Sequence, residues 1–206
     1  MISEAVGLAQ LLDAMKRNGY VVFEDGKKPF NLNIIGIRAE KQEVDGFDDY
    51  LVALWREQTS KGIWRWHHRS WEITTLPGRY YLINRLLNRK GCAILAPGQY
   101  RGAYKIGLHK GTTALVQTGA VRVFRDDNKD EVYDYTDLEK GFFGINIHRA
   151  GKQGTTEKIG RWSAGCQVFQ NADDFQHFMW LCKEARSHWG NSFTYTLLEE
   201  KDIREI

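Results

Sequence analysis

The sequence is poor in cysteine, has no long apolar run and is nearly balanced in charge. Its three cysteines, at positions 92, 166 and 182, are odd in number and show no CxxC spacing, which argues against a disulfide framework and a structural zinc site. No stretch approaches the roughly 18 consecutive apolar residues of a membrane span, so no membrane partner is expected. There are 29 Lys and Arg against 26 Asp and Glu, and a net charge of +3 is too small to indicate a nucleic-acid partner.

The first residues also lack the features of an export signal. They have no basic region, Glu4 comes early, and Gln10 and Asp13 interrupt the apolar stretch. This segment predicts a short amphipathic helix rather than a signal peptide, so the chain is expected to be cytoplasmic as synthesised.

What the sequence does contain is typical of one globular unit. Of its 206 residues, 42% are hydrophobic and 27% are charged, which is enough for a sizeable core without a disulfide or metal. Aromatic residues reach 13%, with seven Trp, and most of these are expected in the core or lining a cleft. No repeat or linker divides the chain, and we predict an N-terminal helical extension over 1–30 and a single domain over 31–206.

The hydrophobic pattern predicts an α+β fold that is mostly β. An apolar stripe through Ile2, Val6 and Met15 indicates a first helix ending near Asn18-Gly19. Short β-branched or aromatic segments follow, separated by turn residues, and they favour a sandwich or barrel-like core. They include 20–23, 78–84 and 142–148. One long late helix should begin after the capping residue Asn171 and end near Trp189-Gly190, before a final strand over 192–198.

The residues most typical of chemistry lie between 142 and 170. In a strand over 142–148, Asn146 and His148 would share one face, opposite the apolar Ile145 and Ile147, with His148 at the strand's end. A 17-residue loop separates His148 from Cys166, which follows Ser163, Ala164 and Gly165. Gly165 permits an unusual backbone angle, and a cysteine on such a turn opposite a histidine has the parts of a thiolate–imidazole pair. Backbone N–H groups of the turn would then stabilise an oxyanion.

A histidine, a loop and Ser-x-Gly-Cys resemble the catalytic motif of the L,D-transpeptidase (YkuD-like) family, in a divergent phage or bacterial member. The resemblance implies a β-rich catalytic domain that acts on peptidoglycan stem peptides, with no cofactor. It implies Cys166 as the nucleophile, His148 as its base, Ser163 in the orienting or oxyanion shell, and Gly165 shaping the turn. The thioacyl-enzyme would pass to water or to an amine. Without an export signal, the protein would reach the wall by release from the cell.

The sequence departs from the family pattern at two places. Ala164 replaces the usual histidine, and Gln167-Val168 stands where an arginine normally follows the cysteine by two. Since an arginine fork is the natural partner of a carboxylate, another cation would have to bind the substrate carboxylate. The substrate-binding candidates are Arg149, Arg161, Trp162, Tyr104 and His109.

Three alternatives remain open. The protein would be a wall- or carbohydrate-binding module if its aromatic residues stack on sugars and Cys166 is merely a small buried side chain. A cysteine protease on ordinary L-peptides would use the same residues. A metal site at His67-His68 is disfavoured because neighbouring strand residues point to opposite faces.

Cys92 and Cys182 are expected in the core. The pattern Asp126-x-Asn128-x-Asp130 lacks the glycine of a calcium loop and predicts a hairpin turn.

Overall fold

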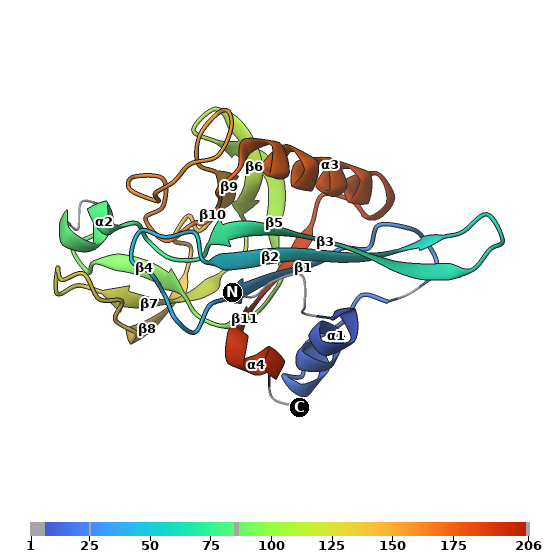
Figure 1. Ribbon diagram of the computed structural model, residues 1–206, viewed down its shortest axis with the longest axis horizontal. Helices are drawn as coiled ribbons and strands as arrows, with labels where there is room; N and C mark the ends of the chain where they lie inside the picture. The colour runs from blue at the N-terminus through green and yellow to red at the C-terminus, as the bar shows by residue number, and fades with distance from the viewer. Residues whose placement is uncertain (1–6, 25, 85–86, 205–206) are drawn as a thin grey trace.

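The computed structural model describes residues 7–24, 26–84 and 87–204, and its α+β architecture is mostly β, as predicted (Figure 1). Eight of the described strands close a barrel in the order β1-β11-β5-β6-β9-β10-β3-β2, and β4, β7 and β8 form a smaller sheet. The barrel strands are β1 (Asn33–Arg38), β2 (Asp49–Gln58), β3 (Trp64–Thr74), β5 (Gly98–His109), β6 (Thr112–Gln117), β9 (Ile147–Arg149), β10 (Gln167–Phe169) and β11 (Phe193–Glu199). The smaller sheet contains β4 (Cys92–Leu95), β7 (Val121–Asp126) and β8 (Thr136–Gly141).

The hairpin of β2 and β3 extends away from the rest of the molecule (Figure 1). Its strands pair without interruption from Asp49 opposite Ile73 to Gln58 opposite Trp64. Trp64 and Trp66 are half-buried and alternate with the exposed Arg65 and His67, as a half-exposed aromatic strand requires.

The main core lies between the barrel and α3 (Ala172–Trp189). The Asn171 side chain accepts the N–H groups of Asp173 and Asp174, and Gly190 ends the helix with a φ of 83°. Both ends of the predicted late helix are thus confirmed. The helix buries Phe175, Phe178, Met179, Leu181, Cys182 and Ala185.

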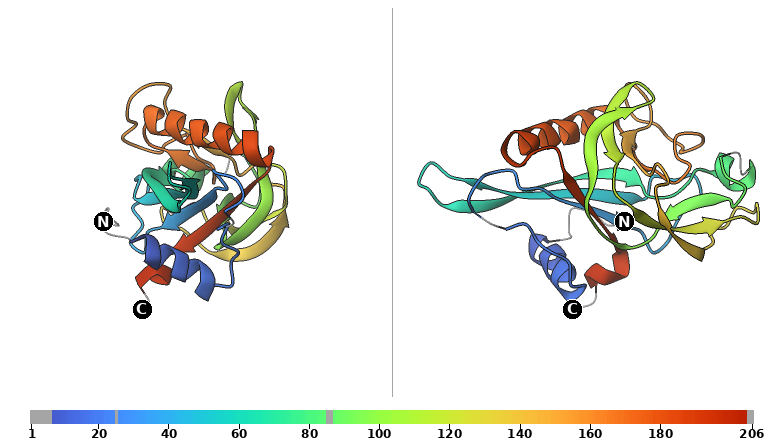
Figure 2. Two further views of the ribbon diagram at one scale, coloured as in Figure 1. Left: turned by 90° about the vertical axis from the view of Figure 1, so that its right-hand side faces the viewer. Right: turned by 180° about the vertical axis from the view of Figure 1, so that it is seen from behind.

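A second core joins α1 (Leu8–Arg17) and α4 (Glu200–Arg204) to the outer face of the barrel, and Figure 2 shows the two helices side by side. Leu11, Ala14 and Met15 supply the buried face of α1. The helix ends at Asn18, as predicted, whereas Ile2 and Val6 lie outside the described residues.

Two of the predicted strands are wrong, and the first of them lies beside the site. Residues 79–84 form a helix, α2 (Arg79–Asn84), because Gly78 O accepts the N–H groups of Tyr81 and Leu82 and the Leu82 side chain becomes fully buried. Residues 20–23 are not a strand either. Side-chain oxygens of Gln99 and Asn33 accept the N–H groups of Val21 and Phe23 in place of a strand ladder.

The predicted strand over 142–148 is reduced to the three residues of β9. Gly144 has a φ of 71°, which interrupts an extended chain. The N–H groups of Phe143 and Ile145 both donate to Gln117 Oε1, at 3.1 and 2.9 Å, instead of to a neighbouring strand. His148 is therefore the middle residue of a short strand and not the last residue of a long one.

A buried polar network ties the first strands to the smaller sheet. Arg38 is 1% exposed and donates to Thr75 Oγ1 and to the carbonyl of Leu95, in β4. Asp49, also fully buried, accepts the N–H of Ala39 and both the N–H and hydroxyl of Thr75. These bonds fix the smaller sheet against the barrel, where the candidate site lies. None of the helices in the described ranges is long and apolar enough to cross a membrane.

Candidate active site

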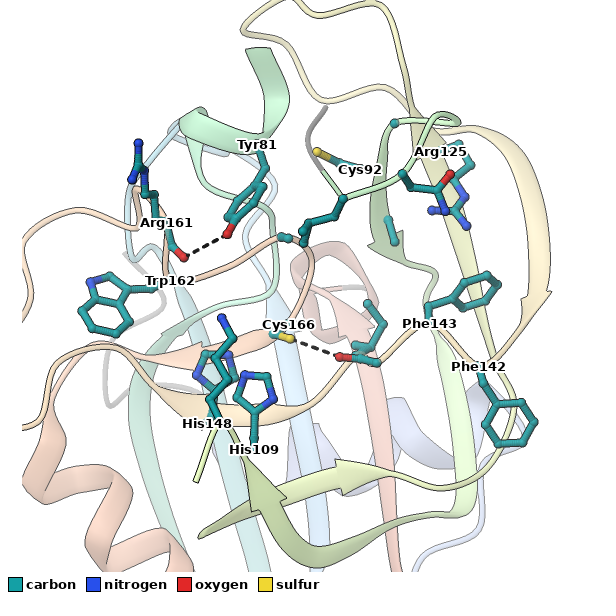
Figure 3. Close-up of a pocket in the computed structure, with 18 residues that line it drawn as sticks. Tyr81, Cys92, His109, Arg125, Phe142, Phe143, His148, Arg161, Trp162 and Cys166 are labelled. Carbon is teal, nitrogen blue, oxygen red and sulfur yellow. Dashed lines mark hydrogen bonds between the residues drawn. The ribbon is translucent and has the colours of Figure 1, made fainter. Parts of the chain in front are cut away.

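A cavity of about 300 Å³ opens where the barrel meets the smaller sheet (Figure 3). The barrel contributes the end of β5 and the middle residue of β9, the smaller sheet contributes β4 and β7, and the loop before β10 closes one side. Cys166 and His148, the predicted nucleophile and base, both line this cavity.

The turn before β10 holds Cys166 in place through Ser163 and Gly165. Ser163 is fully buried; its hydroxyl donates to Cys166 O at 2.9 Å and accepts the Gly165 N–H at 3.1 Å. Gly165 has a φ of 122°, and a Cβ at this position would collide with the carbonyl oxygen of Ala93 in β4. Only glycine fits there, so Gly165 sets the shape of the turn that precedes Cys166. Ser163 orients the turn, since both of its hydroxyl contacts are internal to it.

The Cys166 thiol is half-buried and hydrogen-bonded to backbone groups. Its Sγ donates to Gly144 O at 3.3 Å and accepts the N–H of Asn146 at 3.4 Å. Burial raises the pKa of the thiol to about 11, against smaller lowering effects of the Asn146 N–H and the Lys110 charge. At neutral pH the free site therefore holds a protonated thiol.

His148 is oriented by the carbonyl of its own neighbour. β9 and β10 pair in parallel with His148 opposite Val168, so the imidazole lies beside the start of β10. Its Nδ1 contacts the carbonyl oxygen of Arg149 at 2.8 Å. A carbonyl only accepts, so Nδ1 carries the proton and Nε2 is left with a lone pair. Burial is the main cause that lowers the pKa of His148 to about 4; the Arg149 carbonyl acts in the opposite direction, and the nearby His109 and Lys110 make smaller lowering contributions.

A second imidazole, His109, stacks on His148. The ring centroids are 4.6 Å apart with an interplanar angle of 25°, and Figure 3 shows both rings beside Cys166. Asn146 Oδ1 accepts the N–H of Gln117, so its amide nitrogen donates to His109 Nδ1, at 2.9 Å. His109 thus carries its proton on Nε2, the opposite tautomer to His148. Burial, followed by the charge of Lys110, lowers the pKa of His109.

The predicted substrate-binding residues divide into two groups. His109, Arg161 and Trp162 line the cavity, and Trp162 is 46% exposed at its edge. Tyr104 was a wrong prediction, because it is fully buried in the core and does not line the cavity. Arg149 does not line it either, since its guanidinium turns back to donate to Gly151 O.

Several residues of the site escaped the sequence prediction. The strand pattern placed Asn146 on the same face as His148, which could have identified Asn146 as a residue of the site. No feature of the sequence singled out Lys110 or Arg125. Cys92 is buried, as predicted, and also forms part of the cavity wall, whereas Cys182 lies in the core. Within the described part of the chain, no group of three or more His, Cys, Asp or Glu residues is arranged to hold a metal ion.

Comparison with known proteins gave no relatives: no family model, no curated protein and no solved structure matches this chain. What the chain does must therefore be inferred from the geometry of the cavity and from the motif itself.

Proposed function

We propose that this protein is a cysteine-dependent acyltransferase on peptidoglycan stem peptides, an L,D-peptidase or L,D-transpeptidase that works through a Cys166 thioacyl-enzyme. The observation that carries the proposal is that Cys166 and His148 line one cavity. Cys166 follows a turn that only glycine can make, and His148 holds its proton on Nδ1, which leaves a lone pair at Nε2 to accept a proton. The resemblance of the motif to the L,D-transpeptidase family supplies the substrate class.

In the acylation step, Cys166 Sγ transfers its proton to His148 Nε2 and attacks the carbonyl carbon of an L-residue joined to a D-residue. The N–H groups of Gly165 and Gln167 are engaged by Ser163 Oγ and Asn146 O, which leaves the intervening Cys166 N–H to stabilise the oxyanion. When the tetrahedral intermediate collapses, the C–N bond breaks and the leaving amine takes the proton from His148.

In the second step, water or an amine attacks the thioester carbonyl. His148 accepts a proton from the attacking group. The C–S bond of the tetrahedral intermediate then breaks and His148 returns the proton to the sulfur, so the free thiol is restored. Hydrolysis would yield a shortened stem peptide and transfer would yield a cross-link. The mouth of the cavity suits a peptide, because Leu87, Phe142 and Trp162 expose apolar surface around a polar centre.

The test is incubation of wild type, Cys166→Ala and His148→Ala with a disaccharide-tetrapeptide, followed by mass spectrometry of the products. Loss of the terminal D-residue identifies a peptidase, and a cross-linked dimer identifies a transpeptidase. Both variants should be inactive, whereas Cys182→Ala, which removes a core thiol remote from the cavity, should retain activity if its melting curve shows a folded protein. Cleavage of all-L peptides alone would refute the wall assignment. Binding of peptidoglycan without any product would refute the enzyme.

A further inference from the structure

The turn between β5 and β6 carries a residue that the turn itself does not favour. His109 pairs with Thr112, so Lys110 and Gly111 form a two-residue hairpin turn, with φ values of 48° and 78°. Such a turn needs positive φ at both positions and is normally built with Asn, Asp or Gly at the first. Lysine in the left-handed region costs free energy, and an unfavourable backbone conformation in a site is an indication of function.

Lys110 brings an uncompensated positive charge into the cavity. It lines the cavity, yet within the described ranges it makes no ion pair or hydrogen bond. The described lining also contains no Asp or Glu. An isolated cation facing a cavity without carboxylates favours an anionic ligand.

The other two cations that line the cavity are already engaged. Arg125 is 5% exposed, forms an ion pair with Glu139 at 2.9 Å and lies over the Phe143 ring. The Arg161 guanidinium lies 4.0 Å from the centre of the Tyr80 ring, and in Figure 3 it points away from Cys166. By elimination, Lys110 is the cation available to a ligand beside the thiol.

The position of Lys110 relative to the reacting groups indicates which anionic group of the substrate it would bind. The leaving amine must reach His148 Nε2, and His109, stacked on His148, is the residue directly before Lys110. In an amino acid, the α-carboxylate is separated from the amine by one carbon. A leaving residue with a free carboxylate would thus place that carboxylate on the side of the cavity where Lys110 lies. The lowered pKa values of His148 and His109 are in line with this, since the Lys110 charge contributes to both.

We propose that Lys110 binds the free α-carboxylate of the residue that cleavage releases, so that the site selects peptides whose scissile bond is the last in the chain. This inference rests on the proposed function and assigns to the β5–β6 turn the carboxylate recognition for which the motif itself has no arginine. Internal bonds and amidated ends then become poor substrates.

The test compares two tetrapeptide substrates that differ only in a C-terminal carboxylate or carboxamide. Wild type should prefer the carboxylate by roughly 10- to 100-fold in kcat/KM, the usual worth of one charge-assisted contact. Lys110→Asn should abolish this preference by slowing the carboxylate substrate far more than the carboxamide. Because asparagine suits the left-handed turn, the same variant should fold and melt at a higher temperature. Lys110→Arg should keep the preference, and so should Lys105→Met, which removes an exposed lysine of β5 that lies outside the cavity.

The outcomes separate the inference from the function on which it rests. An equal loss on both substrates would mean that Lys110 acts on the thiol and not on the carboxylate, and no loss would mean that it has no part in recognition. Either result overturns the inference while leaving Cys166-dependent cleavage intact. A wild type that cleaves neither substrate would overturn the proposed function and the inference with it.

Discussion

The raised pKa of Cys166 makes a prediction about how the free enzyme reacts with alkylating agents. Burial disfavours the thiolate, so the pKa lies at about 11 instead of 9.0. Two units correspond to about 100-fold less thiolate at any pH well below 9. Since only the thiolate attacks iodoacetamide, Cys166 in the folded protein should react about 100-fold more slowly at pH 7.5 than in the unfolded chain.

The assay measures the rate of iodoacetamide labelling between pH 6.5 and 10 by mass spectrometry of the Cys166 peptide. In native protein the logarithm of the rate should rise by about one per pH unit through pH 10, whereas protein unfolded in guanidinium should level off near pH 9. The Cys182 peptide is the internal control for folding, since this thiol is fully buried and should stay unlabelled. Lys110→Asn removes a charge that lowers the Cys166 pKa and should slow the reaction further. A native profile that levels off below pH 9 would refute the account of a protonated resting thiol.

Three further predictions concern pH and single substitutions. Because His148 has a pKa of about 4, kcat/KM should stay flat down to about pH 5 and fall only as the imidazole is protonated near pH 4, and a midpoint above 6 in the pH–rate profile would contradict this. Gly165→Ala should abolish activity and, because its Cβ collides with Ala93, lower the free energy of unfolding by more than the roughly 1–2 kcal/mol that a left-handed residue costs. Gly154→Ala is the control: it is also at positive φ but in open space, so it should lower the free energy of unfolding by no more than that and stay active. Denaturant unfolding measures both. Burial raises the pKa of Asp126 to about 6, so this carboxyl group stabilises the fold less as the pH rises from about 4 to 6. Asp126→Asn should therefore raise the melting temperature more at pH 7.5 than at pH 4, and the reverse order would exclude this cause.

The sequence predicts the helices whose signals are local. Asn171 caps α3 and Gly190 ends it, and both act within a few residues of the helix. The strands predicted over 78–84 and 142–148 failed because distant groups decide the backbone there. Gln117 accepts two N–H groups that a strand would have paired, and Gly78 donates to the carbonyl of Ser163. No local pattern contains these partners.

The closure of the barrel is likewise beyond local patterns. β1 pairs in parallel with β11, from Ile34 opposite Tyr195 to Arg38 opposite Glu199, so strands from opposite ends of the chain are neighbours. The alternation of apolar residues indicates that these segments are strands, but it carries no information on which strands pair. The sequence therefore supports a β-rich core and leaves its topology undetermined.

The residues of the candidate site also fall into two groups, those fixed by local contacts and those placed by the fold. Ser163, Gly165 and Cys166 form one turn, and their arrangement could be predicted because it is fixed by contacts within the turn and by the missing side chain of Gly165. Lys110 and Asn146 could not be assigned roles in this way. Their places in the site depend on a hairpin and a segment that come together only in the folded barrel.

The stacked imidazoles bear on one difference between this sequence and the motif that it resembles, the alanine at position 164. Ala164 and His109 line the same cavity, so a ring from the β5–β6 hairpin is present where the motif supplies none. The two rings also have opposite hydrogen-bonding character, since His148 offers a lone pair at Nε2 and His109 offers an N–H. These two characters match a substrate amide, whose carbonyl oxygen accepts a hydrogen bond and whose nitrogen, after cleavage, becomes an amine that must take up a proton. Because the hairpin that supplies His109 also carries Lys110, one turn of the barrel brings both an imidazole and a cation to the cavity that contains the thiol.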